Sequence, residues 1–263
     1  VKVALLVRSN DRYATGLRDT LLLYLPQEVL SSGLSTQNYP NIGAGEPGDY
    51  SGVVSTIAAG DVEPDIVVIL GSAEAWEIAE QLDSLLTKEP VYFVGDAVKN
   101  AEEAAKAPIS LEGRIWGTAP QNFGEWDYAP YVNFRVKYQA EYGNENPDNF
   151  QFIANAFDAL YAIALAASQG FTGPDLARGM TMLSDGDSFQ TTPEQAQQAL
   201  QRLISGQSIN LMGASGPLNF DENGDPTASP IALWCFEDGK VPEQGVIFED
   251  EDFTPLTCGE LTR

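Results

Sequence analysis

The sequence predicts an α/β fold in which a doubly wound parallel sheet is followed by a helical segment and a C-terminal hairpin or edge strand. Short apolar runs recur through the first half without alternating polar residues, as in strands that are buried on both faces. Segments with helical periodicity separate these runs, which is the pattern of βαβ units. The second half consists mainly of helical segments, so we expect the architecture to change near residue 125.

Strands are expected at five places in the first half. The run at 66–70, Ile-Val-Val-Ile-Leu, is the strongest, because β-branched residues dominate it. The others are residues 3–7, 34–39, 91–94 and 113–118. Loops that follow parallel strands meet at the carboxyl edge of the sheet, where ligands of open α/β sheets bind. The loops expected there are 8–13, 71–74, 95–98 and 119–126.

Helices are expected between these strands and through the second half. Asn10 or Asp11 can cap the first helix, and Pro26 kinks or ends it. The helix within 147–168 is apolar around most of its circumference, so it must be buried on more than one side. We expect no sheet beside it, and therefore expect a missing upstream segment or a second chain to cover the helix around Phe157. Further helices are expected at 50–59, 74–86, 128–142, 176–183 and 193–204.

Three segments follow from this pattern. Residues 1–125 are expected to form an α/β lobe, and residues 126–230 a helical segment that would pack on another lobe. Residues 231–263 are expected to form a returning strand and an acidic tail. Residues 217–220 and 231–236 predict either a hairpin or two edge strands.

Two features of the C-terminal part have competing explanations. Residues 221–225, Asp-Glu-Asn-Gly-Asp, fit an Asn-Gly turn better than a calcium loop, because Pro226 stands where such a loop needs glycine. Cys235 and Cys258 are either bridged or free, and a bridge would be typical of a protein outside the cytoplasm.

The composition excludes several functions. With 14 basic and 38 acidic residues the formal net charge is −24, which repels phosphate backbones, so no nucleic acid is expected as a partner. No apolar run reaches the ~20 residues of a membrane helix, and the chain opens directly into a strand, as a mature or trimmed chain would. The absence of histidine excludes Ser-His-acid triads and histidine-ligated zinc. No glycine-rich nucleotide loop is found, so we expect neither an enzyme nor a cofactor.

Four stretches of the chain together resemble one known family. Residues 3–16 contain Asn-Asp-Arg-Tyr-Ala-Thr-Gly at their end, and residues 49–51 precede Pro-Asp-Ile-Val-Val at 64–68. The other stretches are 156–166, and 213–225 with Trp234 and 238–240. In this order they resemble the class I periplasmic solute-binding proteins of ABC transporters, the branched-chain amino acid or extracellular ligand-binding receptor type. The N-terminal part of that family's first lobe is lacking here.

The resemblance implies a protein outside the cytoplasm, periplasmic or extracellular, with a lipid anchor in the precursor as one option. It would bind a small solute, an amino acid or a similar small carboxylate or amide, and deliver it to a membrane permease. The cleft would close over the ligand by a hinge motion. The alternative is a sensor or assembly module that keeps the lobe fold and has lost ligand binding.

The resemblance also implies which residues touch the ligand. They are Tyr13 and its neighbour Asn10 in the first turn, Ser72 after the third strand, and Asp96 or the adjacent Ala97 after the fourth. The Tyr13 ring could cover an apolar ligand, Ser72 could donate to a ligand carboxylate, and Asp96 could pair with an ammonium. The plainer explanations are a surface tyrosine and two helix caps.

Overall fold

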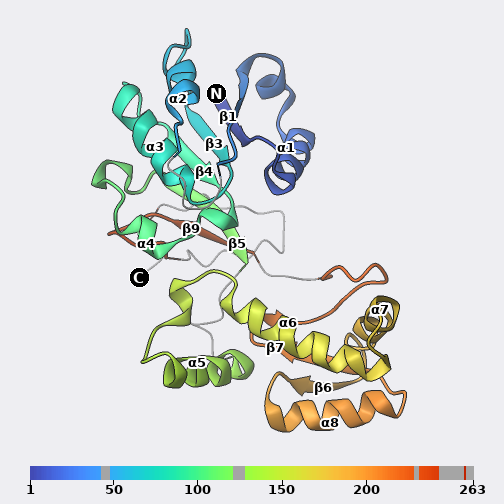
Figure 1. The fold of residues 1–263 in the computed structure, drawn as a ribbon. Helices are drawn as coiled ribbons and strands as arrows, with labels where there is room; N and C mark the ends of the chain where they lie inside the picture. Colours follow the sequence, from blue (N-terminus) through green and yellow to red (C-terminus); the bar gives the residue numbers. More distant parts are fainter. Residues whose placement is uncertain (43–47, 121–127, 228–230, 243–257, 259–263) are drawn as a thin grey trace. The chain divides into compact units, whose positions relative to one another are not determined.

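The chain forms two compact units (Figure 1). The computed structural model describes residues 1–42, 48–120, 128–227, 231–242 and 258. Unit 1 comprises Val1–Ala119 and Ile231–Arg263, and unit 2 comprises Pro120–Pro230. Each has its own sheet and its own hydrophobic core, so the two are described separately.

Unit 1 is built on a six-stranded sheet with the order β2-β1-β3-β4-β5-β9. The strands from β2 to β5 pair in parallel with their neighbours, so that Val3 lies opposite both Leu34 and Ile66. This confirms the doubly wound parallel sheet that the apolar runs predict. The bounds are β1 Val3–Arg8, β2 Leu34–Tyr39, β3 Ile66–Leu70, β4 Val91–Val94, β5 Ile115–Pro120 and β9 Ile231–Cys235.

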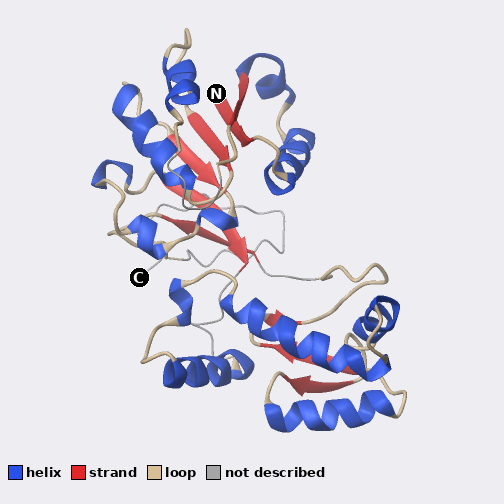
Figure 2. Cartoon of the chain, in the orientation of Figure 1, coloured by secondary structure: helices blue, strands red, loops and turns tan. Residues whose placement is uncertain are grey.

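Helices lie on both faces of this sheet (Figure 2). On one face Leu6, Ile69 and Tyr92 belong to a core that includes side chains of α2 and α3. On the other, Leu5 and Val68 pack with leucines of α1. Burial on both faces explains why these strands have no polar alternation. The helices are α1 Arg12–Tyr24, α2 Ser51–Ala58, α3 Glu74–Leu85 and α4 Ala101–Ala104.

Unit 2 combines α-helices with a small sheet of order β6-β7-β8. Strand β6 pairs with β7 in parallel, and β8 pairs with β7 antiparallel. Phe189 and Leu211 of this sheet share a core with Leu165 and Leu203 of the helices. The bounds are α5 Ala129–Glu141, α6 Ile153–Ala166, α7 Gly173–Thr181, β6 Asp187–Gln190, α8 Pro193–Ile204, β7 Ile209–Gly213 and β8 Gly216–Pro217.

The small sheet corrects the expectation that α6 has no sheet beside it. One face of α6, with Ala162 and Leu165, packs in the core that includes β6 and β7. Phe157 does not face outward either, because its ring lies 5.0 Å from the ring of Phe134 in α5. What stays uncovered in the described structure is a third face, where Leu160 is 68% exposed and Ile163 54% exposed.

The C-terminal segments form two edge strands rather than a hairpin. Strand β8 lies at the edge of the small sheet, and β9 lies at the edge of the six-stranded sheet of unit 1. The hairpin between 217–220 and 231–236 is therefore wrong, although Phe220 and Pro226 form one isolated bridge. The division between the units falls after Ala119, and the expected boundary near 125 lies outside the described residues.

Cys235 and Cys258 form a disulfide. It ties residue 258 to strand β9, in which Cys235 is fully buried. Among the described helices, none combines the length and the apolar character that crossing a membrane requires.

Candidate functional site

The carboxyl ends of β1, β3 and β4 lie side by side, because these strands are neighbours in the sheet. The loops that follow them carry every residue that the resemblance assigns to the ligand site. The structure thus brings the loops 8–13, 71–74 and 95–98 to one edge of unit 1, called the carboxyl edge below. Most of the fourth expected loop, 119–126, lies outside the described residues.

Both the backbone amide and the hydroxyl of Tyr13 donate hydrogen bonds to carboxylates. Its amide donates to Asp11 Oδ1 at 2.8 Å, because Asp11 caps the N-terminus of α1. Its hydroxyl donates to Asp96 Oδ1, which follows β4. Burial, together with the hydrogen bond to Asp96 and its charge, raises the pKa of the Tyr13 hydroxyl above its ordinary value. Tyr13 is therefore a neutral donor at physiological pH.

Asp96 begins a short 3-10 helix, η2 Asp96–Val98. Its Oδ1 accepts from the Tyr13 hydroxyl and from the amide of Ala97, the latter at 2.8 Å. Among the hydrogen bonds of the described residues, none ends on Asp96 Oδ2. Asp96 thus has one oxygen fixed by the protein and one available, while Ala97 contributes its backbone amide.

Ser72 lies between β3 and α3. Its amide donates to Glu74 Oε1 at 3.0 Å. The same carboxylate oxygen accepts the hydroxyl of Tyr39, the last residue of β2, at 2.9 Å. The Ser72 hydroxyl makes no hydrogen bond with the described residues, so its donor is available to another partner.

Asn10 is not the helix cap, since Asp11 has that role. It is exposed and adopts a left-handed conformation with φ 56°, which asparagine tolerates better than most residues. This turn reverses the chain between β1 and α1 and so directs Tyr13 toward Asp96.

A charged group that contacts these loops was not predicted from the sequence. Arg8, at the end of β1, donates from Nε to Asp11 Oδ2 at 2.6 Å and from Nη1 to Glu74 Oε1 at 3.1 Å. Its side chain is only 19% exposed, and those of Asp11 and Glu74 are 11% and 14% exposed. An arginine that directly ends a buried apolar strand is the signal that could have found it.

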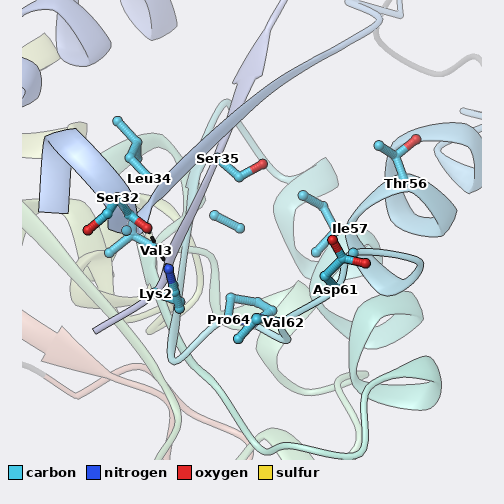
Figure 3. A pocket seen from close by; sticks show the side chains of 13 residues that line it. Lys2, Val3, Ser32, Leu34, Ser35, Thr56, Ile57, Asp61, Val62 and Pro64 are labelled. Carbon is cyan, nitrogen blue, oxygen red and sulfur yellow. Dashed lines mark hydrogen bonds between the residues drawn. The ribbon is translucent and has the colours of Figure 1, made fainter.

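A separate cavity of about 300 Å³ lies at the other edge of the sheet (Figure 3). It is formed where β1, β2 and β3 begin, and neither Tyr13, Ser72 nor Asp96 lines it. The Lys2 ammonium there donates to the carbonyl oxygen of Ser32. Its lining includes the apolar residues Val3, Leu34, Ile57, Val62 and Pro64 and the polar residues Ser35, Thr56 and Asp61, all labelled in Figure 3.

Metal binding has little support among the described residues. The cluster of potential ligands found there is Cys235, Glu237 and Cys258, and its two sulfur atoms are joined in the disulfide. Residues 221–225 form a turn in which Asp221 Oδ1 accepts from the amides of Asn223 and Asp225. Residues 221–225 therefore form the expected Asn-Gly turn rather than a calcium loop.

No family model and no curated protein matches the chain. Solved structures do. The leucine-binding protein LivK from Thermotoga maritima aligns with a TM-score of 0.65 at 20% identity, over 94% of this chain and 60% of that one. The chain has the fold of a substrate-binding protein. LivJ of Streptococcus pneumoniae, a branched-chain amino acid transporter substrate-binding protein in complex with isoleucine, aligns with a TM-score of 0.62 at 19% identity, over 91% and 58%.

An extracellular ligand-binding receptor from Rhodopseudomonas palustris has the same fold, with a TM-score of 0.58 at 16% identity, over 92% of this chain and 63% of that one. This shared fold is the one that the resemblance of the four sequence stretches implies. The three similar proteins are named as binding proteins or receptors. The chain spans about 60% of the length of these structures.

Proposed function

We propose that this chain binds a small solute outside the cytoplasm and delivers it to an ABC-type membrane permease. The solute would be an amino acid or a similar small carboxylate or amide, and no chemical conversion would follow. The observation that carries the proposal is the pair of Tyr13 and Asp96 at the carboxyl edge of a sheet with the substrate-binding fold. Two of the similar structures are a leucine-binding protein and a complex with isoleucine, which makes these amino acids the first ligands to test.

The geometry of the pair suits an ammonium group. Asp96 Oδ2 is available, while Tyr13 and the Ala97 amide fix the rotamer of the carboxylate through Oδ1. A positioned carboxylate forms a stronger, charge-assisted hydrogen bond than one that must first be ordered. The Ser72 hydroxyl and the Tyr13 ring would then contact the remainder of the ligand, with Asn10 at the rim of the edge.

A screen of L-amino acids by thermal unfolding tests this proposal. A ligand at 100 times its dissociation constant should stabilise the chain by about 2.7 kcal/mol. Isothermal titration of the best ligand against Asp96→Asn should then show an affinity about tenfold lower, the effect of losing one charge-assisted hydrogen bond. Asp61→Asn, at an exposed residue of the opposite edge, should bind like the parent.

Two outcomes would count against the proposal. One is a chain whose midpoint no amino acid, small carboxylate or amide moves. The other is a ligand that binds Asp96→Asn and Tyr13→Phe as tightly as the parent, which would place the ligand elsewhere. The first outcome would favour a sensor or assembly module without a ligand.

We also propose that additional polypeptide covers the third face of α6, either an upstream segment or a second chain. Leu160 and Ile163 lie three residues apart on one side of this helix and are 68% and 54% exposed. Phe152, the residue before the helix, is 40% exposed. Large apolar side chains that are exposed close together are typical of an interface. Leu160→Lys should convert a dimer of this chain to a monomer in light scattering. If the chain is already monomeric, the same substitution should destabilise a longer protein that includes the upstream segment. The proposal would be contradicted if the substitution had no effect in either protein.

A further inference from the structure

The Arg8 side chain connects two loops of the carboxyl edge. Its guanidinium binds two carboxylates that come from different loops, Asp11 after β1 and Glu74 after β3. Glu74 lies 66 residues further along the chain than Arg8. The planar fork of arginine suits such a double contact, whereas a lysine ammonium would act as a single point.

Each of these carboxylates in turn holds a residue of the proposed ligand site. Asp11 Oδ1 accepts from the amide of Tyr13 while Oδ2 binds Arg8. Glu74 Oε1 accepts from the amide of Ser72. The same oxygen lies 2.9 Å from the hydroxyl of Tyr39, whose single proton is shared with the carbonyl oxygen of Leu70 at 3.1 Å.

We infer that Arg8 is a positioning residue, which fixes Tyr13 and Ser72 relative to each other by binding Asp11 and Glu74 together. Arg8 would not touch the ligand. It would set the distance between the loops after β1 and β3, and thereby the place of Tyr13 relative to Ser72. This inference rests on the proposed function for its effect on binding, but the coupling of the two loops can be measured without a ligand.

The test compares Arg8→Met with Arg18→Met in the whole chain. Arg18 is on the surface of α1, where it pairs with the adjacent Asp19, so its loss changes the net charge equally without touching either loop. Amide hydrogen exchange should become faster at Tyr13, Ala14 and Ser72 in Arg8→Met. It should stay unchanged at Lys2, whose amide binds Asp65 at the opposite edge. The affinity for L-leucine or L-isoleucine should fall about tenfold.

Two conservative variants separate positioning from helix capping. Asp11→Ser can still cap α1 but cannot pair with Arg8, so it should lose affinity like Arg8→Met if positioning matters. Arg8→Lys should not restore the parent affinity, because one ammonium cannot satisfy both carboxylates in the same geometry.

The results distinguish this inference from the proposed function. If the parent chain binds neither amino acid, the proposed function fails for these ligands, while the exchange measurement still decides whether Arg8 couples the loops. Unchanged exchange at Tyr13 and Ser72 in Arg8→Met would overturn the inference. So would a uniform rise in exchange along all strands of unit 1, which would indicate a general loss of stability.

Discussion

Gly95 leaves the space in which the Tyr13 hydroxyl lies. A Cβ atom at position 95 would stand far inside van der Waals contact with that hydroxyl oxygen. The absence of a side chain at the end of β4 is therefore a condition for the contact between Tyr13 and Asp96. Gly71, which follows β3, has the same relation to the hydroxyl of Tyr39.

Gly95→Ala should displace the Tyr13 ring and break its hydrogen bond to Asp96. We expect a loss of up to about 2 kcal/mol in the free energy of unfolding, the contribution of a hydrogen bond to a charged group. Denaturant unfolding followed by tryptophan fluorescence reports mainly on this unit, since three of the four tryptophans, Trp76, Trp116 and Trp234, belong to it. The matched control is Gly52→Ala in α2, where a Cβ meets nothing within 4 Å and should stabilise by about 0.5–1 kcal/mol. Equal effects of the two substitutions would contradict the role of Gly95.

Asp11 should make the stability of unit 1 depend on pH in the acid range. Burial alone would raise the pKa of Asp11, but Arg8 and the amides of Tyr13 and Ala14 hold it below its ordinary value. A carboxyl with a lowered pKa in the folded state stabilises above its ordinary pKa and loses this contribution as the pH falls through the folded pKa.

The variant Asp11→Asn keeps a capping side chain and removes this titration. Its free energy of unfolding should lie below that of the parent near neutral pH, and the difference should shrink as the medium is acidified below about pH 4. Urea titrations at a series of pH values measure it. A difference that stays constant down to pH 2 would show that the charge of Asp11 does not contribute.

Asp158 joins three segments of unit 2 through one buried carboxylate. It accepts from the amides of Ala214 and Ser215 at 2.8 and 2.6 Å and from the hydroxyls of Ser215 and Thr191. Asp158→Ala should destabilise unit 2 by about 3 kcal/mol, because it leaves several buried donors unpaired. Circular dichroism during denaturation measures this, with the exposed Asp187→Ala as control. A loss no larger than that of the control would mean that water replaces the carboxylate.

Reduction of the disulfide between Cys235 and Cys258 should lower the stability of unit 1. The bridge spans 23 residues of sequence, and closing a loop of that length is worth about 3 kcal/mol by its effect on the unfolded chain. The thermal midpoint should fall on addition of a reductant, and the double variant with serine at both positions should lack this response. An equal midpoint with and without reductant would show that residues near 258 add nothing to the folding of β9.

The sheet of unit 1 could be predicted closely because burial on both faces leaves continuous apolar runs. Residues 34–39, 66–70 and 91–94 are strands with the expected bounds. The sheet of unit 2 was missed because its strands are short and half polar. Asp187–Gln190 buries only Phe189, and Ile209–Gly213 shows the alternation of one buried face over just five residues.

The candidate site could also be predicted only in part from the sequence. A resemblance could indicate Tyr13, Ser72 and Asp96, since each follows the end of a strand by a few residues. It could not indicate that Arg8 and Glu74 bind each other, because 66 residues separate them and only the order of the strands brings them together. Nor could it show that Asp11 rather than Asn10 caps α1, since both residue types suit that position.

The position of β9 in the sequence limits when the sheet of unit 1 can be completed during synthesis. The six-stranded sheet receives its edge strand only after the whole of Pro120–Pro230 has been synthesised. A ribosome-bound chain that ends near residue 230 therefore exposes the edge of β5, where Trp234 and Phe236 will later pack. Domains generally fold as units during synthesis. The sheet of unit 1 can therefore be completed only after residues 231–235 have been made.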